Sequence, residues 1–152
     1  MTGRIPRAVL VSAAMVVVAG LAFLIWRGAS GRSPASLVVG DCFDVPTASQ
    51  RIEDIRGLAC DAPHGGEVFH VYDASIPAAA YPKDADWEAM IYPVCDPVFE
   101  AYTGTPVAER LDIGYLFLVP TADRWTAGDR RVTCFITPPD GTKLTRSYRA
   151  AP

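Results

Sequence analysis

The most constraining feature of the chain is a run of nineteen uncharged, mostly apolar residues, Ala8 to Trp26, flanked by Arg7 and Arg27. As a helix that rises about 1.5 Å per residue, this run reaches roughly the 30 Å of a bilayer's hydrocarbon core. We therefore predict a tethered protein. Its expected parts are a cytoplasmic tail at residues 1–7, a transmembrane helix at 8–26, a linker at 27–36 and one domain at 37–152.

A cleaved signal peptide is the alternative for the same segment, with Arg4 and Arg7 as its charged leader and the small residues 28–30 as a cutting site. The apolar run is longer than the usual core of about 7 to 15 residues, and Trp26 suits the interfacial end of a helix. We therefore favour the uncleaved anchor. A lipoprotein anchor fits less well, because Cys42 lies far from the apolar run.

All four cysteines follow the apolar run, and none forms a CxxC pair. Zinc sites and thioredoxin-type redox sites normally bring two cysteines within a few residues of each other. Two structural disulfides in an oxidising compartment fit this spacing better than four free thiols in a cytosolic domain. We therefore expect a single membrane span, a cytoplasmic amino terminus and an extracytoplasmic domain that holds Cys42, Cys60, Cys95 and Cys134.

Charge divides the chain at the same place as hydropathy. Residues 1–32 hold four arginines and no acidic residue, whereas residues 33–152 hold ten basic and seventeen acidic residues, a formal charge of −7. An acidic domain without a basic cluster is a poor candidate for binding nucleic acid or anionic lipid. Twelve arginines against two lysines suggest a GC-rich bacterial genome, so the membrane we expect is that of a bacterial cell.

Six segments show the alternation, the apolar content or the turn boundaries that are typical of strands. The segment 111–119 is apolar almost throughout and predicts a central strand. Residues 138–141, PPDG, predict a turn before the last of the six. The predicted strands are 37–45, 57–61, 67–73, 111–119, 130–137 and one through Leu144 and Tyr148.

One amphipathic helix is predicted between Asp84, which can cap its first turn, and Gly104, which ends it. Pro93 and Pro97 each remove a backbone donor, so we expect this helix to be kinked or split, with Asp96 capping the second piece. Strands, a helix and further strands together predict an α+β domain. In it, a small, mostly antiparallel sheet is packed by the kinked helix.

The same periodicity indicates how the cysteines pair. Cys95 lies on the apolar face of the predicted helix, and Cys134 shares a strand face with apolar neighbours, so both point into one core. Of the three pairings that four cysteines allow, this pattern favours Cys95 with Cys134 and Cys42 with Cys60.

Five short motifs, in order, resemble the bacterial septum formation family of membrane-anchored extracytoplasmic domains. They are VGDCFD at 39–44, LACDAPHGGEVF at 58–69, Tyr81 with Pro82, Cys95 with Tyr102 and Gly104, and Pro120 followed by Trp125 and AGDRRVTC at 127–134. The resemblance covers roughly residues 38–149 and implies a role in the cell envelope or division septum, with no established reaction, cofactor or catalytic residue. One departure is Arg146 before Ser147, where the family tends to have a glycine.

The segment PHGGEVF brings together the side chains best suited to chemistry, His64, Glu67 and His70. On a regular strand Glu67 faces opposite to His70, so the three side chains do not easily converge on one metal, and the spacing matches no zinc signature. We expect Pro63–Gly66 to form a tight turn in which His64 hydrogen-bonds the backbone near Cys60. General-base or metal duty for His64, or a partner-binding loop, are the alternatives.

Trp125, Asp129 and Arg130 form the second candidate site. Asp123 could cap a short helical turn that carries Trp125, Gly128 permits a positive φ, and Asp129 can close an Asx turn or pair with an arginine. These features predict a structural corner. The alternative is a recognition surface, because a partly exposed tryptophan beside an arginine is typical of binding hot spots.

The sequence holds no GxSxG, SxxK, P-loop or GxGxxG motif, and two disulfides would leave no thiol nucleophile. We therefore expect no catalysis, cofactor or metal. The function we expect is a membrane-tethered interaction module of the cell envelope that binds another envelope protein. Two alternatives are a small-molecule or metal receptor with a pocket lined by His64, Glu67 and Trp125, and an envelope hydrolase that uses His64 and Glu67.

Overall fold

The computed structural model describes residues 33–45, 55–75 and 80–151. The predicted cytoplasmic tail, the predicted transmembrane helix and most of the predicted linker lie outside these residues. Within the three described ranges, no helix combines the length and the hydrophobicity that a membrane crossing requires.

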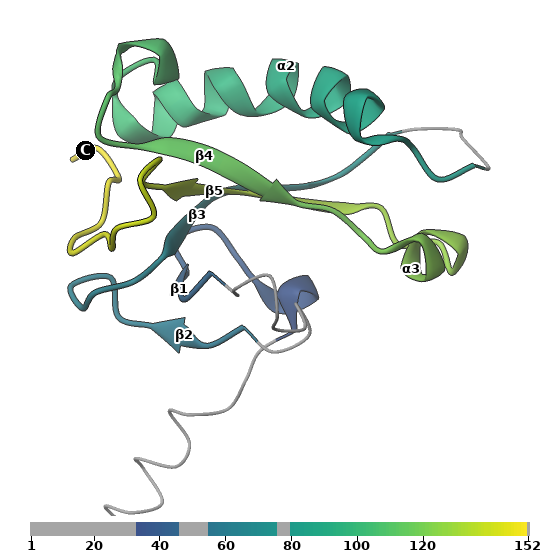
Figure 1. The fold of residues 1–152 in the computed structure, drawn as a ribbon, viewed down its shortest axis with the longest axis horizontal. Helices are drawn as coiled ribbons and strands as arrows, with labels where there is room; N and C mark the ends of the chain where they lie inside the picture. The colour runs from purple at the N-terminus through teal and green to yellow at the C-terminus, as the bar shows by residue number, and fades with distance from the viewer. Residues whose placement is uncertain (1–32, 46–54, 76–79, 152) are drawn as a thin grey trace, which may run out of the picture. The chain divides into compact units, whose positions relative to one another are not determined.

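One antiparallel sheet of five strands forms the centre of the domain, in the order β2-β1-β3-β5-β4 (Figure 1). This arrangement, with one long helix packed on the sheet, confirms the predicted α+β class. The strands are β1 (Cys42–Phe43), β2 (Gly57–Leu58), β3 (Gly66–Asp73), β4 (Gly114–Leu118) and β5 (Arg131–Thr137).

The long helix α2 (Asp84–Thr103) is continuous, although it contains Pro93 and Pro97. Of the two outcomes expected from these prolines, a kinked or a split helix, the split is therefore wrong. Both prolines lie on the exposed side of the helix, while residues spaced four apart on the other side are buried in the core and hold it in place. Asp96 does not cap a second piece, because its carboxylate instead accepts a hydrogen bond from the hydroxyl of Tyr115 on β4. The buried residues of α2 are Trp87, Ile91, Cys95 and Phe99.

Both ends of α2 lie close to their predicted places. The first turn is capped by Lys83 rather than Asp84, and the backbone N–H of Lys83 donates to the carboxylate of Asp86. Gly104 ends the helix in the left-handed conformation, with a φ of 75°, which a residue without a side chain adopts at little cost.

The sheet separates two hydrophobic clusters, because successive side chains of a strand point to opposite faces. Phe69 and Cys134 enter the larger cluster, which includes the buried face of α2, whereas Val68 and Phe135 enter the smaller one with Leu37, Phe43 and Ile55. Figure 1 shows α2 along one side of the sheet and the segments that carry β1 and β2 away from that helix.

Strict alternation fails within β3. The pairing of β3 with β5 shifts register between Val68 and His70, as a β-bulge does. As a result Phe69 and Tyr72 both contact the larger cluster, although alternation would place them on opposite faces. The bulge leaves no trace in the hydropathy pattern.

Strand β4 lies at an edge of the sheet, so the prediction of a central strand for residues 111–119 is wrong. Its apolar residues are explained by two partly covered faces. Tyr115 and Phe117 pack on the larger cluster, and Leu118 packs on the smaller one. The hydrophobicity of this segment therefore indicates that both faces of the strand are partly buried. It does not indicate that the strand has a neighbour on each side.

The predicted strand through Leu144 and Tyr148 is also absent from the described part of the chain. Leu144 forms only an isolated antiparallel bridge with His64, in which each backbone N–H donates to the other's carbonyl at 2.9 Å. Residues 37–45 likewise contribute only the two-residue β1, preceded by the 3₁₀ turn Pro34–Ser36.

Two disulfides close the domain, Cys42–Cys60 and Cys95–Cys134, which are the pairs that the periodicity favours. The first joins β1 to the turn that follows β2. The second joins α2 to β5 and lies in the larger cluster.

A close approach between β1, β3 and β5 requires a glycine at position 66. A Cβ atom there would lie 2.8 Å from Cδ2 of Phe135 and 3.0 Å from Cζ of Phe43, and both rings are buried. These rings pack edge to face with centroids 5.2 Å apart, so neither can retreat without opening the smaller cluster.

Candidate functional site

The carboxylate of Glu67 is fully buried and accepts three hydrogen bonds. Its Oε1 receives the hydroxyls of Tyr102, at 2.7 Å, and of Ser147, at 2.6 Å, and its Oε2 receives the backbone N–H of Tyr148, at 2.8 Å. Burying a charge is costly unless donors compensate it, and these three do so. Glu67 thus ties β3 to the end of α2 and to the carboxyl-terminal segment.

The carboxyl-terminal segment has further attachments at the same place. The N–H of Ala150 donates to the carbonyl of Tyr102 at 2.7 Å, and the guanidinium of Arg149 lies 5.0 Å from the centre of the Tyr102 ring. Burial, followed by the hydrogen bond to Glu67, raises the pKa of the Tyr102 hydroxyl. The phenol therefore stays protonated and can donate a hydrogen bond to Glu67.

His64 is also fully buried, in the turn between β2 and β3. Its Nδ1 lies 2.8 Å from the carbonyl oxygen of Ala62, which can only accept, so Nδ1 carries the proton. Nε2 is buried and has no hydrogen-bond partner among the described residues. The contact with Ala62, two residues after Cys60, is the local backbone contact that the sequence predicts for His64.

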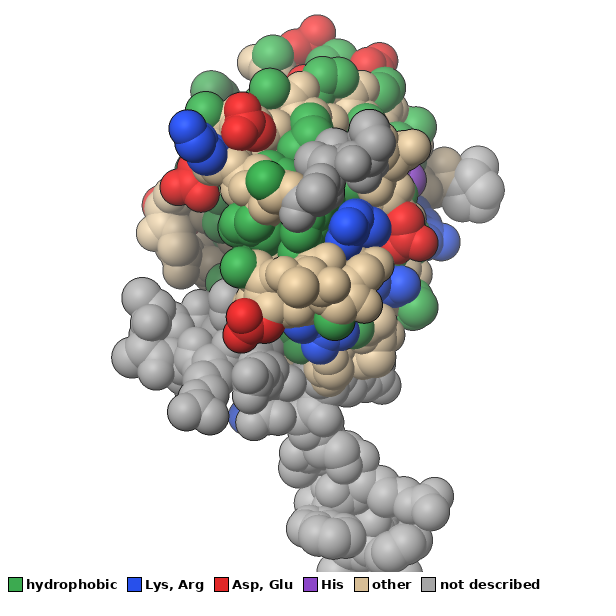
Figure 2. All heavy atoms as spheres, turned by 90° about the vertical axis from the view of Figure 1, so that its right-hand side faces the viewer, with side chains coloured by type: hydrophobic (Ala, Val, Ile, Leu, Met, Phe, Trp, Pro, Cys, Tyr) green, Lys and Arg blue, Asp and Glu red, His purple; other side chains and the backbone are tan. Residues whose placement is uncertain are grey.

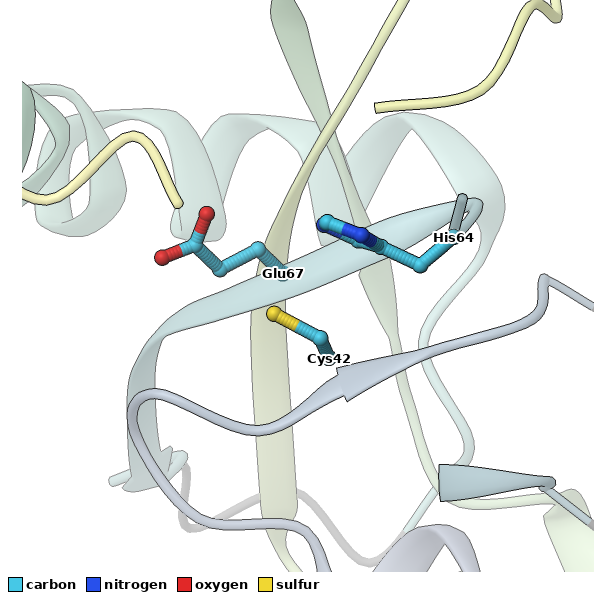
Figure 3. A group of neighbouring side chains, drawn as sticks. All are labelled: Cys42, His64 and Glu67. Carbon is cyan, nitrogen blue, oxygen red and sulfur yellow. The ribbon is translucent and has the colours of Figure 1, made fainter. Parts of the chain in front are cut away.

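Cys42, His64 and Glu67 each present an atom that could bind a metal, and these atoms lie within 4.8 Å of one another. In Figure 3 the carboxylate of Glu67 points away from the imidazole of His64. The Cys42 sulfur is bonded to Cys60 and is no thiolate, while all three donors near Glu67 are directed at its carboxylate. The donor set therefore does not fit a metal ion while the disulfide is closed.

His70 does not join this group. Its ring stacks on that of Tyr72, with centroids 5.1 Å apart, and partial burial lowers the pKa of the imidazole. Among the described residues, the structure brings together His64 and Glu67 but not His70.

Trp125 is 2% exposed, so it is not the partly exposed tryptophan that the recognition alternative requires. The short helix α3 (Ala122–Thr126) carries it, with Thr121 rather than Asp123 as the cap. Its ring packs edge to face on Trp87, 5.4 Å away between centroids, and the guanidinium of Arg130 lies 3.6 Å above it. This is the structural corner that the sequence predicts.

Asp129 closes that corner in both of the predicted ways. One carboxylate oxygen accepts the backbone N–H of Arg131 at 3.0 Å, and the other accepts Nε of Arg124 at 2.8 Å. Gly128 precedes it with a φ of 95°. Partial burial acts to raise the pKa of Asp129, but the hydrogen bonds from Arg131 and Arg124 outweigh it, and the pKa is lowered.

The two candidate sites lie near opposite ends of α2. Trp125 contacts Trp87 in the first turn, whereas Glu67 contacts Tyr102 in the last. At about 1.5 Å per residue these helix positions are roughly 22 Å apart, so one pocket lined by His64, Glu67 and Trp125 does not form.

A groove with a volume of about 580 Å³ lies instead between Ser33–Ala35 and Phe117–Thr121. It includes none of the three residues expected for a receptor pocket. Arg131 lies on its wall and donates to the carbonyl of Leu37 at 2.6 Å.

Sequence reasoning did not identify Tyr102 and Ser147 as partners of Glu67. They lie 35 and 80 residues from it along the chain, and no local pattern connects them. The departure at Arg146 does not prevent the contact, because Ser147 reaches the carboxylate with Arg146 in place.

The features that distinguish this domain are the two disulfides, the buried Glu67 and the helix packed on a five-stranded sheet. The family model described as septum formation matches residues 33–151. The chain belongs to the septum formation family. Neither a curated protein nor a solved structure was found to match the chain.

Proposed function

We propose that this member of the septum formation family is a membrane-tethered, non-catalytic interaction module of the bacterial cell envelope, and that it acts at the division septum by binding another envelope protein. The apolar run at residues 8–26 supports the tether. The two disulfides support an oxidising location outside the cytoplasm.

The burial of Glu67 and its three hydrogen bonds support the non-catalytic part of the proposal. A general acid or base must exchange a proton with a substrate, and this buried carboxylate is instead engaged by three donors of the fold itself. The neighbouring His64 is buried as well, and its Nδ1 is held by Ala62. This arrangement supports structure rather than turnover.

The distribution of surface charge supports a protein partner over nucleic acid. Figure 2 shows acidic and basic side chains scattered among hydrophobic ones on the face that carries α3, with no cluster of a single sign. A surface that binds nucleic acid instead gathers its basic side chains into a patch or stripe.

Three measurements on the full chain in dividing cells test the proposal. They are its localisation in the cell, its sensitivity to protease added outside the cell, and in vivo cross-linking to its neighbours. The expected result is enrichment at the septum, a carboxyl-terminal domain accessible to protease from outside the cell, and one reproducible protein neighbour. A uniform distribution with no reproducible neighbour would contradict the interaction module. A carboxyl terminus protected from external protease would contradict the topology.

The variant His64→Gln separates this proposal from a hydrolase. Glutamine can still donate to the carbonyl of Ala62 but cannot serve as a general base. With both disulfides formed and normal abundance, the variant should keep its neighbour and complement a deletion. Loss of complementation by a folded, abundant variant would favour the hydrolase.

The groove between Ser33–Ala35 and Phe117–Thr121 favours a small-molecule receptor as the second candidate, because about 580 Å³ is a typical volume for a ligand site. A receptor would show a ligand-dependent rise in melting temperature when the full chain is screened against envelope metabolites. The interaction module predicts no such rise.

A further inference from the structure

Strand β4 is an edge without the usual protection against pairing. In the described part of the chain it has one strand neighbour, β5, and its sequence GYLFL carries no charge and no proline. Its pairing with β5 is regular over all five residues, without a bulge. Edge strands normally carry one of these devices, because their free N–H and C=O groups pair readily with another strand.

Exposed hydrophobic side chains border this edge. Leu116, in the middle of β4, is 53% exposed on the side away from α2, and Tyr92 of α2 is 43% exposed on the other. Tyr92 contacts the rings of both Tyr115 and Phe117, with centroids about 6 Å apart. Leu111, three residues before the strand, is almost fully exposed. The open backbone edge therefore lies between two apolar flanks.

The opposite edge of the sheet differs. Strand β2 has two residues, Gly57 and Leu58, and offers too few backbone groups for a stable ladder. Of the two outer strands of the described sheet, β4 is therefore the one expected to pair between molecules.

The partner that fits this edge best is a second copy of β4. An antiparallel pair about a two-fold axis at Leu116 places Leu116 opposite its own copy, Tyr115 opposite Phe117, and Gly114 opposite Leu118. Apolar side chains then meet on both faces of the sheet, and aromatic cross-strand pairs of this kind stabilise a sheet. The acids beside the strand are already engaged, Asp112 by Arg110 at 2.8 Å and Asp96 by Tyr115.

We propose that two copies of this chain associate through their β4 edges, antiparallel about Leu116, so that one sheet runs through both domains. This self-association is separate from the envelope partner proposed above. Its tests measure association between copies of this chain, so its failure would leave the proposed function standing.

The experiment measures self-association of the full-length chain in detergent by sedimentation, with charge variants at Leu116. Two like charges would face each other across the two-fold axis, so Leu116→Lys and Leu116→Glu should each weaken self-association by about tenfold or more. A mixture of the two variants should restore it. Val38→Lys is the matched control, because Val38 is 56% exposed and lies in the turn before β1, a strand that β3 and β5 separate from β4 in the sheet.

A photo-reactive phenylalanine derivative in place of Leu116 gives the second measurement, in cells that carry two differently tagged copies. A cross-link between the two tags supports the proposal. A monomeric chain, equal effects of Leu116→Lys and Val38→Lys, failure of the mixture to restore association, or a cross-link from position 116 only to another protein would each overturn it. Intact disulfides and an unchanged far-UV circular dichroism spectrum in each variant exclude misfolding as the cause.

Discussion

The hydroxyl of Tyr102, in the last turn of α2, donates a 2.7 Å hydrogen bond to the buried carboxylate of Glu67 on β3. The same carboxylate accepts the hydroxyl of Ser147 and the N–H of Tyr148. One acidic side chain thereby joins three segments that are distant along the chain. Its chemistry is used to hold the fold, although the sequence alone also allowed a catalytic role.

Removing this carboxylate should destabilise the domain. In Glu67→Ala three donors lose their buried acceptor, and we expect a loss on the order of 3–5 kcal/mol in the free energy of unfolding. Glu67→Gln keeps one acceptor oxygen and should lose on the order of 2 kcal/mol. Ser147→Ala, the control, removes a single donor and should cost about 1 kcal/mol. Denaturant unfolding of the full chain measures all three, and equal stability of Glu67→Ala and the native chain would contradict this account.

The two disulfides should contribute unequally. Cys95–Cys134 closes a loop of 39 residues and Cys42–Cys60 one of 18. On the loop-entropy model, replacing both cysteines of a bridge by alanine should cost about 4 kcal/mol for the first and about 3 kcal/mol for the second. Thermal unfolding of the paired variants, with and without reductant, checks the order. A greater loss at the shorter loop would contradict the prediction.

Substitution of Trp125 should affect stability. The ring is buried between Trp87 and the guanidinium of Arg130, so Trp125→Ala should cost about 3–5 kcal/mol, and Trp125→Phe about 1–2 kcal/mol. Unfolding followed by circular dichroism measures both. A folded Trp125→Phe protein of native stability that loses its envelope neighbour would instead favour the recognition surface.

The lowered pKa of Asp129 predicts that the domain becomes less stable at acidic pH. The folded state lowers the pKa of this carboxyl below its ordinary 3.8, through hydrogen bonds from Arg131 and Arg124 that outweigh burial. A depressed folded-state pKa gives a stabilisation that is present above the ordinary value and lost as the pH falls through the lower one. The free energy of unfolding should therefore fall more steeply below about pH 4 in the native chain than in Asp129→Asn.

Asp112 provides the comparison for that titration. Its pKa is also lowered, by Arg110, but its side chain is half exposed, so solvent screens the pair. Asp112→Asn should therefore change the acid dependence less than Asp129→Asn does. The reverse order would show that the corner around Asp129 is not the main acid-sensitive element of the two.

Replacing Pro93 by alanine should stabilise the helix. Pro93 lies exposed inside α2 and removes one backbone donor, and a proline in an exposed helix interior is roughly 3 kcal/mol less favourable than alanine. We expect a gain of roughly 1–3 kcal/mol in Pro93→Ala. A loss of stability in denaturant unfolding would indicate that this proline fits its place better than alanine.

Local sequence patterns predicted the helix and strands in which buried and exposed positions recur with a regular spacing. The four-residue spacing of buried positions in α2 and the apolar alternation of β5 located both elements, and together they indicated the pairing of Cys95 with Cys134. Gly104 and Gly128 marked backbone turns with positive φ, as the structure has them. These features depend on neighbours within a few residues, which a sequence displays directly.

Features that depend on distant segments were not predictable in the same way. The bulge in β3 changes which side chains share a face without changing composition. The hydropathy of β4 reflects coverage by α2 and the smaller cluster, so it cannot distinguish an edge strand from a central one. The contact between Glu67 and Ser147 spans 80 residues, and only the assembled fold brings the two together.

The tight packing around Gly66 has a consequence for the evolution of this domain. Even a methyl group at this position would collide with two aromatic rings that belong to different strands. Any homologue that retains both rings must retain the bare backbone between them. Sequences that gain a side chain there should show a compensating smaller residue at one of the two aromatic positions, a covariation that a deep alignment would reveal.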